Sequence, residues 1–330
     1  MKNKREYAFD ILRVVSMFMV IVVHVSNVYS RSYGSISMND FLASLIYNTI
    51  SRVSVPIFLM ISGALLLDRK FDKEKYWKRL WKFVLIIIVW DVIYLVWEYL
   101  YLGATYSPLY KLLWEPYRAH LWYLYTVVLL YFLQPGLKWA LDRMSKKTKW
   151  IVLIIWLALS TYSIFNNSVS HYFTQISYIG YFVLGKYLYD FIKKHVTKKH
   201  NWIEILIIVV CMAMSIILNY VASLKYDKFY NAYFAYRTIF IMLPSFAFYA
   251  YVITNYQKDG INKWIALLSE LSLGVYLIHG IFLDIVVHEI KLHFNISAYI
   301  AIPIYATIIL ILSVASVYIL RKIKPLQKII

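Results

Sequence analysis

The sequence has very little cysteine, few acidic residues and little charge overall. Its 330 residues include one cysteine, Cys211, so no disulfide can form within the chain. Asp and Glu number 17 against 35 Lys and Arg, and charged residues make up 16% of the chain, whereas a soluble domain has about 25%. Glycine-rich phosphate loops, H-E-x-x-H and clustered Cys/His ligands are also missing. Nothing therefore supports ATP-driven transport, zinc chemistry or a resident metal.

Long apolar segments are what the chain has instead. It is 62% hydrophobic with a mean hydropathy of +0.61, against roughly 45–50% apolar residues in soluble domains. Crossing a bilayer takes about 20 apolar residues, and ten segments are long enough or nearly so. They lie near 8–29, 42–67, 80–102, 121–136, 150–165, 172–192, 202–222, 233–255, 264–287 and 298–320. With no internal repeat or linker, the sequence predicts an all-α, polytopic membrane protein with a single domain over residues 1–330.

The basic residues stand in clusters between the apolar segments, which indicates topology control rather than nucleic-acid binding. The two termini and the alternate connections that would share their side of the membrane carry 24 Lys and Arg residues, and the opposite connections carry six. Since cytoplasmic connections are enriched in Lys and Arg, we expect a multi-pass protein of the cell membrane, in contact with the lipid bilayer and with both termini in the cytoplasm.

The first apolar segment contains three ionisable residues: Asp10, Arg13 and His24. Such residues are costly in a membrane span and normally face a protein interior or a wet cavity. Arg13 and His24 are eleven residues apart, which places them on nearly the same helix face, about 16 Å apart along the axis. Asp10 is one turn before Arg13 and can pair with it. The alternative is a purely structural Asp–Arg pair beside a histidine that packs between helices.

The second segment contains Arg52 and Pro56 and closes with Ser62 and Gly63. Arg52 would lie at a membrane depth similar to that of His24. Pro56 removes an intrahelical hydrogen bond and is expected to kink the helix, and the small residues allow close helix contact. Arg52 is either a functional cation or a structural one paired with an acid within the membrane, such as Asp91 or Glu98.

A basic cluster, Lys78, Arg79 and Lys82, stands just before the third segment. Clusters of this kind usually serve topology and anionic lipids. The functional alternative is a cytoplasmic site for an anionic cofactor, because Arg and Lys bind phosphate groups.

Aromatic residues and histidines recur where two later segments approach the outer face. His120, Trp122 and Tyr123 open the fourth segment, and their rings suit either an interfacial belt or a sugar. Tyr276 and His279, with Ser272, share one face of the ninth. His279 and Asp284 also fit the H-x4-D spacing of glycerolipid acyltransferases, which keeps that second class of membrane acyltransferase as an alternative.

Five elements, in order, resemble the acyltransferase-3 family of membrane acyltransferases. They are Asp10-x-x-Arg13 followed by ten residues and His24; Arg52 to Pro56 running to Ser62-Gly63; Arg79-x-x-Lys82, where the family has a second Arg; His120-Leu-Trp-Tyr-Leu124; and Ser272 to His279. The second element is most similar to the branch that contains the enterobacterial common antigen O-acetyltransferase.

The resemblance implies transfer of an acyl group, expected to be acetyl from cytoplasmic acetyl-CoA, to a hydroxyl of a surface polysaccharide or its lipid-linked precursor. Histidine is the usual base for such a step, and a donor must stabilise the oxyanion. The expected catalytic residues are His24, Arg13, Asp10 and Arg52. The residues expected to bind the donor are Arg13, Arg79, Lys82 and Lys78. The residues expected on the acceptor side are His120, Trp122, Tyr123, Tyr276 and His279.

A transporter is the alternative from another class. Arg13, Arg52 and Arg237 could line a route for an anionic substrate, such as an exported polysaccharide. Ten membrane spans and charges within them suit a carrier equally well. Against this interpretation, the sequence lacks the internal repeat that many transporters show.

Overall fold

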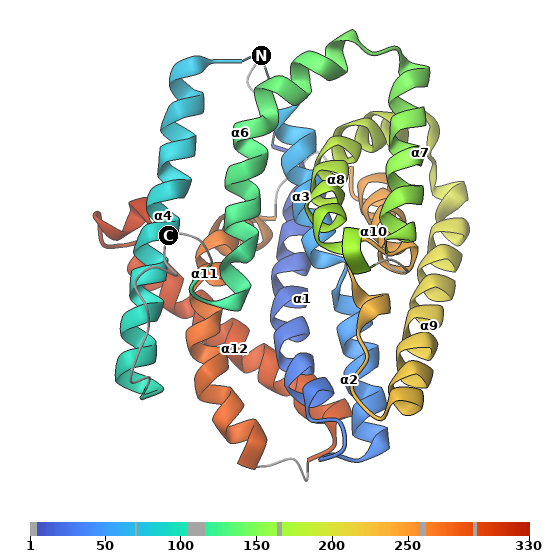
Figure 1. The fold of residues 1–330 in the computed structure, drawn as a ribbon. Coiled ribbons are helices and arrows are strands. Elements are labelled where there is room, and N and C mark those ends of the chain that lie inside the picture. Colours follow the sequence, from blue (N-terminus) through green and yellow to red (C-terminus); the bar gives the residue numbers. More distant parts are fainter. Residues whose placement is uncertain (1–4, 70, 104–115, 164–166, 258–261, 293–295) are drawn as a thin grey trace.

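The computed structural model describes residues 5–69, 71–103, 116–163, 167–257, 262–292 and 296–330, and every regular element in these ranges is a helix (Figure 1). The long helices are α1 (Tyr7–Arg31), α2 (Met38–Ser51), α3 (Ser54–Leu66), α4 (Lys73–Tyr101), α6 (Trp122–Arg143), α7 (Lys146–Tyr162), α8 (Asn167–His195), α9 (Asn201–Tyr226), α10 (Ile239–Asn255), α11 (Lys263–Leu292) and α12 (Ala298–Leu320). Short 3-10 helices are η1 (Ala119–Leu121), η2 (Lys198–His200), η3 (Ala232–Phe234) and η4 (Leu326–Lys328). The all-α prediction is confirmed.

Within the described residues, eight helical segments are long and apolar enough to cross a membrane, with mean hydropathies from 1.2 to 2.6. Helices α2 and α3 together form one of them. The two other segments predicted from the sequence correspond to α7, which has 17 residues, and to α8. The polytopic membrane architecture is therefore confirmed, while the number of ten spans and the cytoplasmic side of the termini stay predictions.

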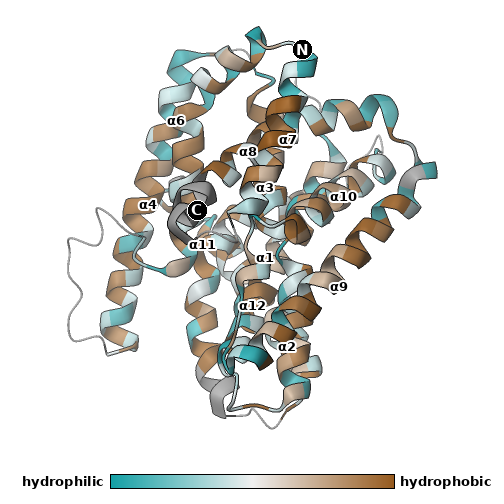
Figure 2. Ribbon diagram, turned by 45° about the vertical axis from the view of Figure 1, so that its right-hand side comes forward, coloured by the Kyte–Doolittle hydropathy of each residue, from teal (hydrophilic) through white to brown (hydrophobic). Residues whose placement is uncertain are grey.

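The outer surfaces of the peripheral helices are apolar. In Figure 2, α4, α6 and α9 are coloured as hydrophobic over most of their middle length. On α4, large apolar side chains are about half exposed in a stripe along one face: Leu85, Ile88, Val92 and Val96. An apolar face that no other helix covers is suited to contact with lipid chains, which are themselves apolar.

Helix α1 lies inside the bundle, in contact with α2, α3, α11 and α12 (Figure 1). Asp10, near the start of α1, is fully buried. Since α1 is covered by protein on several sides, its polar residues can face internal cavities rather than lipid.

Helices α3 and α8 cross with their backbones in contact. A Cβ added to Gly63 would lie 1.7 Å from the carbonyl oxygen of Phe182, and one added to Gly185 would lie 2.1 Å from that of Met60. No side chain fits in either place. The close helix contact predicted for Gly63 is confirmed, and it fixes the position of α3 against α8.

The second membrane segment is broken between α2 and α3, at Arg52 and Val53. Pro56 is the third residue of α3, in the first turn, where backbone N–H groups have no intrahelical partner. The missing N–H of Pro56 would otherwise donate to the carbonyl oxygen of Arg52, four residues earlier, so the interruption at Arg52 and Val53 lies where a proline at this position disturbs a helix. The expected effect of Pro56 on the helix is confirmed. Arg52 lies at this break.

Candidate active site

Three cavities adjoin one another inside the bundle. We call them the His24 cavity, the Arg13 cavity and the Arg79 cavity, after one lining residue of each, and their volumes are about 600, 310 and 720 Å³. Tyr123 and Tyr276 line both the His24 and the Arg13 cavity. Tyr131 lines both the Arg13 and the Arg79 cavity. Arg13 and His24 thus both face the protein interior, in neighbouring cavities.

Three imidazole rings meet at the His24 cavity. They come from α1 (His24), η1 (His120) and α11 (His279). The ring centroid of His24 lies 5.2 Å from that of His279 and 6.1 Å from that of His120, and the latter two are 4.9 Å apart. Among the described residues, no group of His, Cys, Asp and Glu side chains has a geometry suited to a metal ion.

Hydrogen bonds set the tautomer and position of this cluster. Nδ1 of His279 lies 2.5 Å from the carbonyl oxygen of Tyr276, so Nδ1 donates and Nε2 of the neutral ring is the acceptor nitrogen. The hydroxyl of Tyr276 donates to the carbonyl oxygen of His120 and ties α11 to η1. In the described part of the chain, Nε2 of His279 and Nε2 of His120 are buried without a hydrogen-bond partner.

Gly280 lets His120 pack directly against α11. A Cβ at this position would lie 2.6 Å from Cε1 of His120 and 2.6 Å from the hydroxyl oxygen of Tyr94. The Tyr94 hydroxyl is itself fixed, because it donates to the carbonyl oxygen of Leu277 at 2.7 Å. The absence of a side chain at Gly280 therefore determines where the His120 ring lies.

Arg52 lines the His24 cavity and makes no ion pair within the described residues. Its Nε donates to the side-chain oxygen of Asn48 at 2.8 Å, and its guanidinium carbon lies 5.6 and 5.5 Å from the ring centroids of Phe234 and Tyr236. The remaining N–H groups of this guanidinium have no acceptor among the described residues and can donate to an anion in the cavity.

The acids proposed as structural partners of Arg52 are bound elsewhere. The carboxylate of Asp91 accepts from the Tyr125 hydroxyl at 2.6 Å and from the Tyr117 backbone N–H at 3.2 Å. Glu98 pairs with Arg118 at 2.7 Å. Pairing of Arg52 with either acid is therefore wrong.

Asp284 is the second partner of Arg118, and it also accepts from the indole N–H of Trp97 at 3.0 Å. Its carboxylate shares no hydrogen bond with His279 among those between described residues. Because an H-x4-D site needs the acid beside the imidazole, this geometry does not support the H-x4-D alternative.

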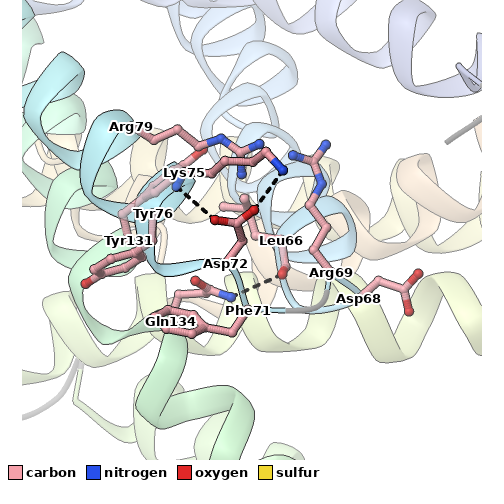
Figure 3. Close-up of a pocket in the computed structure, with 10 residues that line it drawn as sticks. All are labelled: Leu66, Asp68, Arg69, Phe71, Asp72, Lys75, Tyr76, Arg79, Tyr131 and Gln134. Carbon is pink, nitrogen blue, oxygen red and sulfur yellow. Dashed lines mark hydrogen bonds and ion pairs between the residues drawn. The ribbon is translucent and has the colours of Figure 1, made fainter. Parts of the chain in front are cut away.

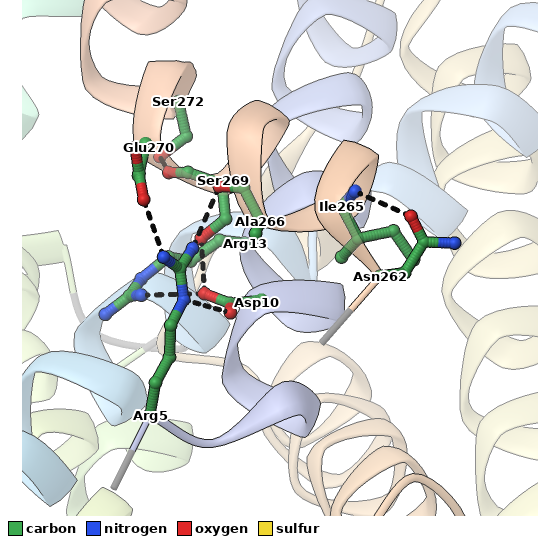
Figure 4. Close-up of polar contacts among 9 residues, drawn as sticks. All are labelled: Arg5, Asp10, Arg13, Asn262, Ile265, Ala266, Ser269, Glu270 and Ser272. Atoms are coloured by element: carbon green, nitrogen blue, oxygen red, sulfur yellow. Dashed lines mark hydrogen bonds and ion pairs between the residues drawn. The ribbon is translucent and has the colours of Figure 1, made fainter. Parts of the chain in front are cut away.

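Arg13 lines the Arg13 cavity and pairs only weakly with Asp10, with 3.4 Å between Nη1 and Oδ1. The buried Asp10 carboxylate has two closer donors, the guanidinium of Arg5 at 2.6 Å and the hydroxyl of Ser269 at 2.7 Å. Arg5 also binds Glu270 at 2.6 Å (Figure 4). This network anchors the start of α1 to α11 and leaves Arg13 directed to its cavity.

The Arg79 cavity lies where α3 ends and α4 begins (Figure 3). The basic ends of Arg69, Lys75 and Arg79 point toward one another there. Lys75 pairs with Asp72 at 2.7 Å, and this hydrogen bond holds the pKa of the exposed Asp72 carboxyl below its ordinary value. Nε of Arg69 is buried without a hydrogen-bond partner in the described residues. Asp68 also lines this cavity and pairs with Lys186 at 2.7 Å. Arg69 and Arg79 are therefore the lining cations that make no ion pair among the described residues.

Lys78 and Lys82 lie outside that cavity. Lys78 lines a separate shallow hollow with Trp77 and Trp81 and pairs with Glu74 at 2.5 Å. Lys82 is exposed, and the Trp81 ring is 65% exposed. Exposed tryptophans with lysines are typical of a membrane interface.

The remaining acceptor-side candidates, His120, Trp122, Tyr123 and Tyr276, all line the His24 cavity, and the fully buried His279 lies behind them. Arg237, which the transporter alternative needs, is not among the lining residues of this cavity.

Sequence reasoning missed Arg5, Arg69 and Tyr131. Arg69 follows the second apolar segment, one residue after Asp68, and Tyr131 lies two turns beyond Tyr123 on α6. The eight-residue spacing of the two tyrosines could have indicated a shared face. Nothing local to Arg5 indicates that it would fold back onto Asp10.

Comparison with known proteins gives one family. A family model described as an acyltransferase domain matches residues 6–322, which include all three cavities. No curated protein and no solved structure matches the chain.

Proposed function

The chain belongs to the acyltransferase-3 family and is a membrane acyltransferase, and we propose that it moves an acetyl group from cytoplasmic acetyl-CoA to a hydroxyl of an extracytoplasmic glycan or of its lipid-linked precursor. The observation that carries this proposal is the series of adjoining cavities, with cations at one end and an imidazole cluster at the other. The family assignment displaces the transporter alternative.

The donor side is the Arg79 cavity. Its free cations, Arg69 and Arg79, suit the phosphate groups of coenzyme A, because guanidinium groups bind phosphate through two parallel hydrogen bonds. The buried, unpartnered Nε of Arg69 supports this fit. In the orientation predicted from the basic clusters, this cavity opens to the cytoplasm, where coenzyme A is found. Arg13 would contact the part of the donor that enters the neighbouring Arg13 cavity.

The chemistry takes place beside His24. The imidazole accepts the proton of the acceptor hydroxyl as its oxygen attacks the thioester carbonyl. The Arg52 guanidinium donates to the oxyanion that forms. As this intermediate collapses, the carbon–sulfur bond breaks and the thiolate leaves to be protonated. A covalent acyl-histidine is the other route open to the same side chain.

The His24 cavity favours an acceptor that carries negative charge. Its charged lining residues among those described are Arg31 and Arg52, and no carboxylate lines it. The walls include the rings of Trp122, Tyr178 and Tyr236, and such aromatic faces suit sugar rings. We therefore propose acidic glycans as the acceptor class. That the chain belongs to the branch that contains the enterobacterial common antigen O-acetyltransferase stays a prediction.

The test is transfer of label from radioactive acetyl-CoA to an acidic glycan in proteoliposomes that contain the purified protein. His24→Ala should lower the transfer rate by about 10²–10⁴-fold, the usual contribution of a general base. His195→Ala is the matched control, because His195 lines none of the three cavities. Absence of label in any glycan would refute the proposed acceptor, and full activity of His24→Ala would refute the role of His24.

A further inference from the structure

Tyr123 and Tyr276 are the two residues that the His24 and Arg13 cavities have in common within the described chain. Their ring centroids are 5.5 Å apart, with an interplanar angle of 69°. Rings in edge-to-face contact at this distance leave no room for a chain of atoms between them. The pair therefore forms the wall that separates the two cavities.

Neighbouring residues hold the two rings in place. The Tyr276 hydroxyl donates to the carbonyl oxygen of His120, and its ring centroid lies 5.8 Å from that of His279. The Tyr123 ring lies against Phe58, with 6.2 Å between centroids. The wall is thus built from α6 and α11 and is tied on one side to the histidine cluster.

The proposed reaction requires something to pass this wall. Arg13 and His24 lie on opposite sides of it, about 16 Å apart along α1. A thioester that enters from the Arg79 cavity reaches His24 only if the two rings separate. A larger acyl group needs a larger displacement of side chains that are already packed, and the cost of such displacement grows steeply in a close-packed interior.

We propose that Tyr123 and Tyr276 form the barrier between the donor and acceptor cavities, and that the size of its opening restricts the reaction to short acyl groups. The inference of a barrier depends on the cavity geometry alone. The inference that it selects short acyl groups also rests on the proposed function.

Thiol accessibility tests the barrier without any enzymatic activity. In a Cys211→Ser background, Asn27→Cys places a thiol in the His24 cavity and Ser272→Cys places one in the Arg13 cavity. A charged methanethiosulfonate reagent is added from each side in turn. From the side on which Asn27→Cys reacts, Ser272→Cys should be protected, and adding Tyr123→Ala should speed its labelling at least tenfold.

Tyr123→Phe keeps the ring and should leave Ser272→Cys protected. The labelling rate of Asn27→Cys, measured in each tyrosine variant, shows that the fold is retained, and Tyr276→Ala replaces Tyr123→Ala if it is not. Equal labelling of Ser272→Cys with and without the tyrosine ring would overturn the barrier.

Selection of the acyl group is measured with acetyl-, butyryl- and hexanoyl-CoA. In the unmodified protein kcat/KM should fall with chain length, and Tyr123→Ala should raise the ratio of hexanoyl to acetyl transfer about tenfold, while Tyr123→Phe keeps it. An unchanged ratio in Tyr123→Ala, with acetyl transfer intact, would overturn the selection. Failure of all transfer in the unmodified protein would instead count against the proposed function and leave the labelling result standing.

Discussion

Arg5 and Asp10 form an ion pair at the start of α1, with 2.6 Å between Nε and Oδ2. The carboxylate is fully buried, and the Arg5 side chain is about one-third exposed. Because Arg5 satisfies most of this buried charge, Arg13 can stay at 3.4 Å and face its cavity.

Loss of Arg5 should therefore weaken donor binding. In Arg5→Gln, the buried Asp10 carboxylate needs another cation, and Arg13 is the nearest. We expect the KM for acetyl-CoA to rise roughly fivefold, equivalent to about 1 kcal/mol, with a smaller change in kcat. Steady-state kinetics measure this, with Glu270→Gln as a control that keeps the Arg5–Asp10 pair. An unchanged KM in Arg5→Gln contradicts the argument.

Arg69 and Arg79 should account for donor affinity more than Lys78 and Lys82 do. The two arginines line the Arg79 cavity, and the two lysines lie outside it. Replacing both arginines with Gln should raise the KM for acetyl-CoA about 100-fold or more, since charge-assisted hydrogen bonds contribute about 1.5–3 kcal/mol each. The double Gln variant of the lysines is the comparison. A larger effect of the lysines would place the donor on the other face of α4.

Gly63→Ala should destabilise the protein strongly. The added Cβ would lie 1.7 Å from the carbonyl oxygen of Phe182, so α3 and α8 must separate, and overpacking of this kind costs about 1–3 kcal/mol or more. The midpoint of thermal unfolding in detergent measures it. Gly136→Ala on α6 is the matched control, because nothing lies within 4 Å of its Cβ. Equal midpoints for the two variants would show that the crossing adapts freely.

Gly280→Ala should lower activity by moving the His120 ring. The new Cβ would contact Cε1 of His120 and the Tyr94 hydroxyl at 2.6 Å each. We expect kcat to fall about tenfold or more, since small misplacements in a site are costly, with little change in the KM for acetyl-CoA, because donor binding is remote. Gly280→Ser should behave similarly. A rise in KM alone would assign Gly280 to donor binding.

The helices and the membrane architecture could be predicted because they depend on local hydropathy, and the position of α1 inside the bundle follows from its ionisable residues. The partners of charged residues could not be predicted in this way. Arg52 and Glu98 lie on segments whose depths suggest a pair, yet Arg118 binds Glu98, because the fold brings η1 and α11 beside α4.

The break in the second span could be located from the sequence. Proline removes the hydrogen bond to the carbonyl four residues earlier and clashes with that carbonyl. The structure ends α2 at Ser51 and starts α3 at Ser54, so the break falls at Arg52, the residue whose carbonyl lacks a partner at Pro56.

Each of the three cavities contains at least one arginine: Arg69 and Arg79 in the first, Arg13 in the second, and Arg31 and Arg52 in the third. Fixed positive charge along a water-accessible route repels hydronium and metal cations, as it does in selective water pores. If these cavities join during turnover, as proposed above, their arginines would oppose the entry of cations while an acyl group passes.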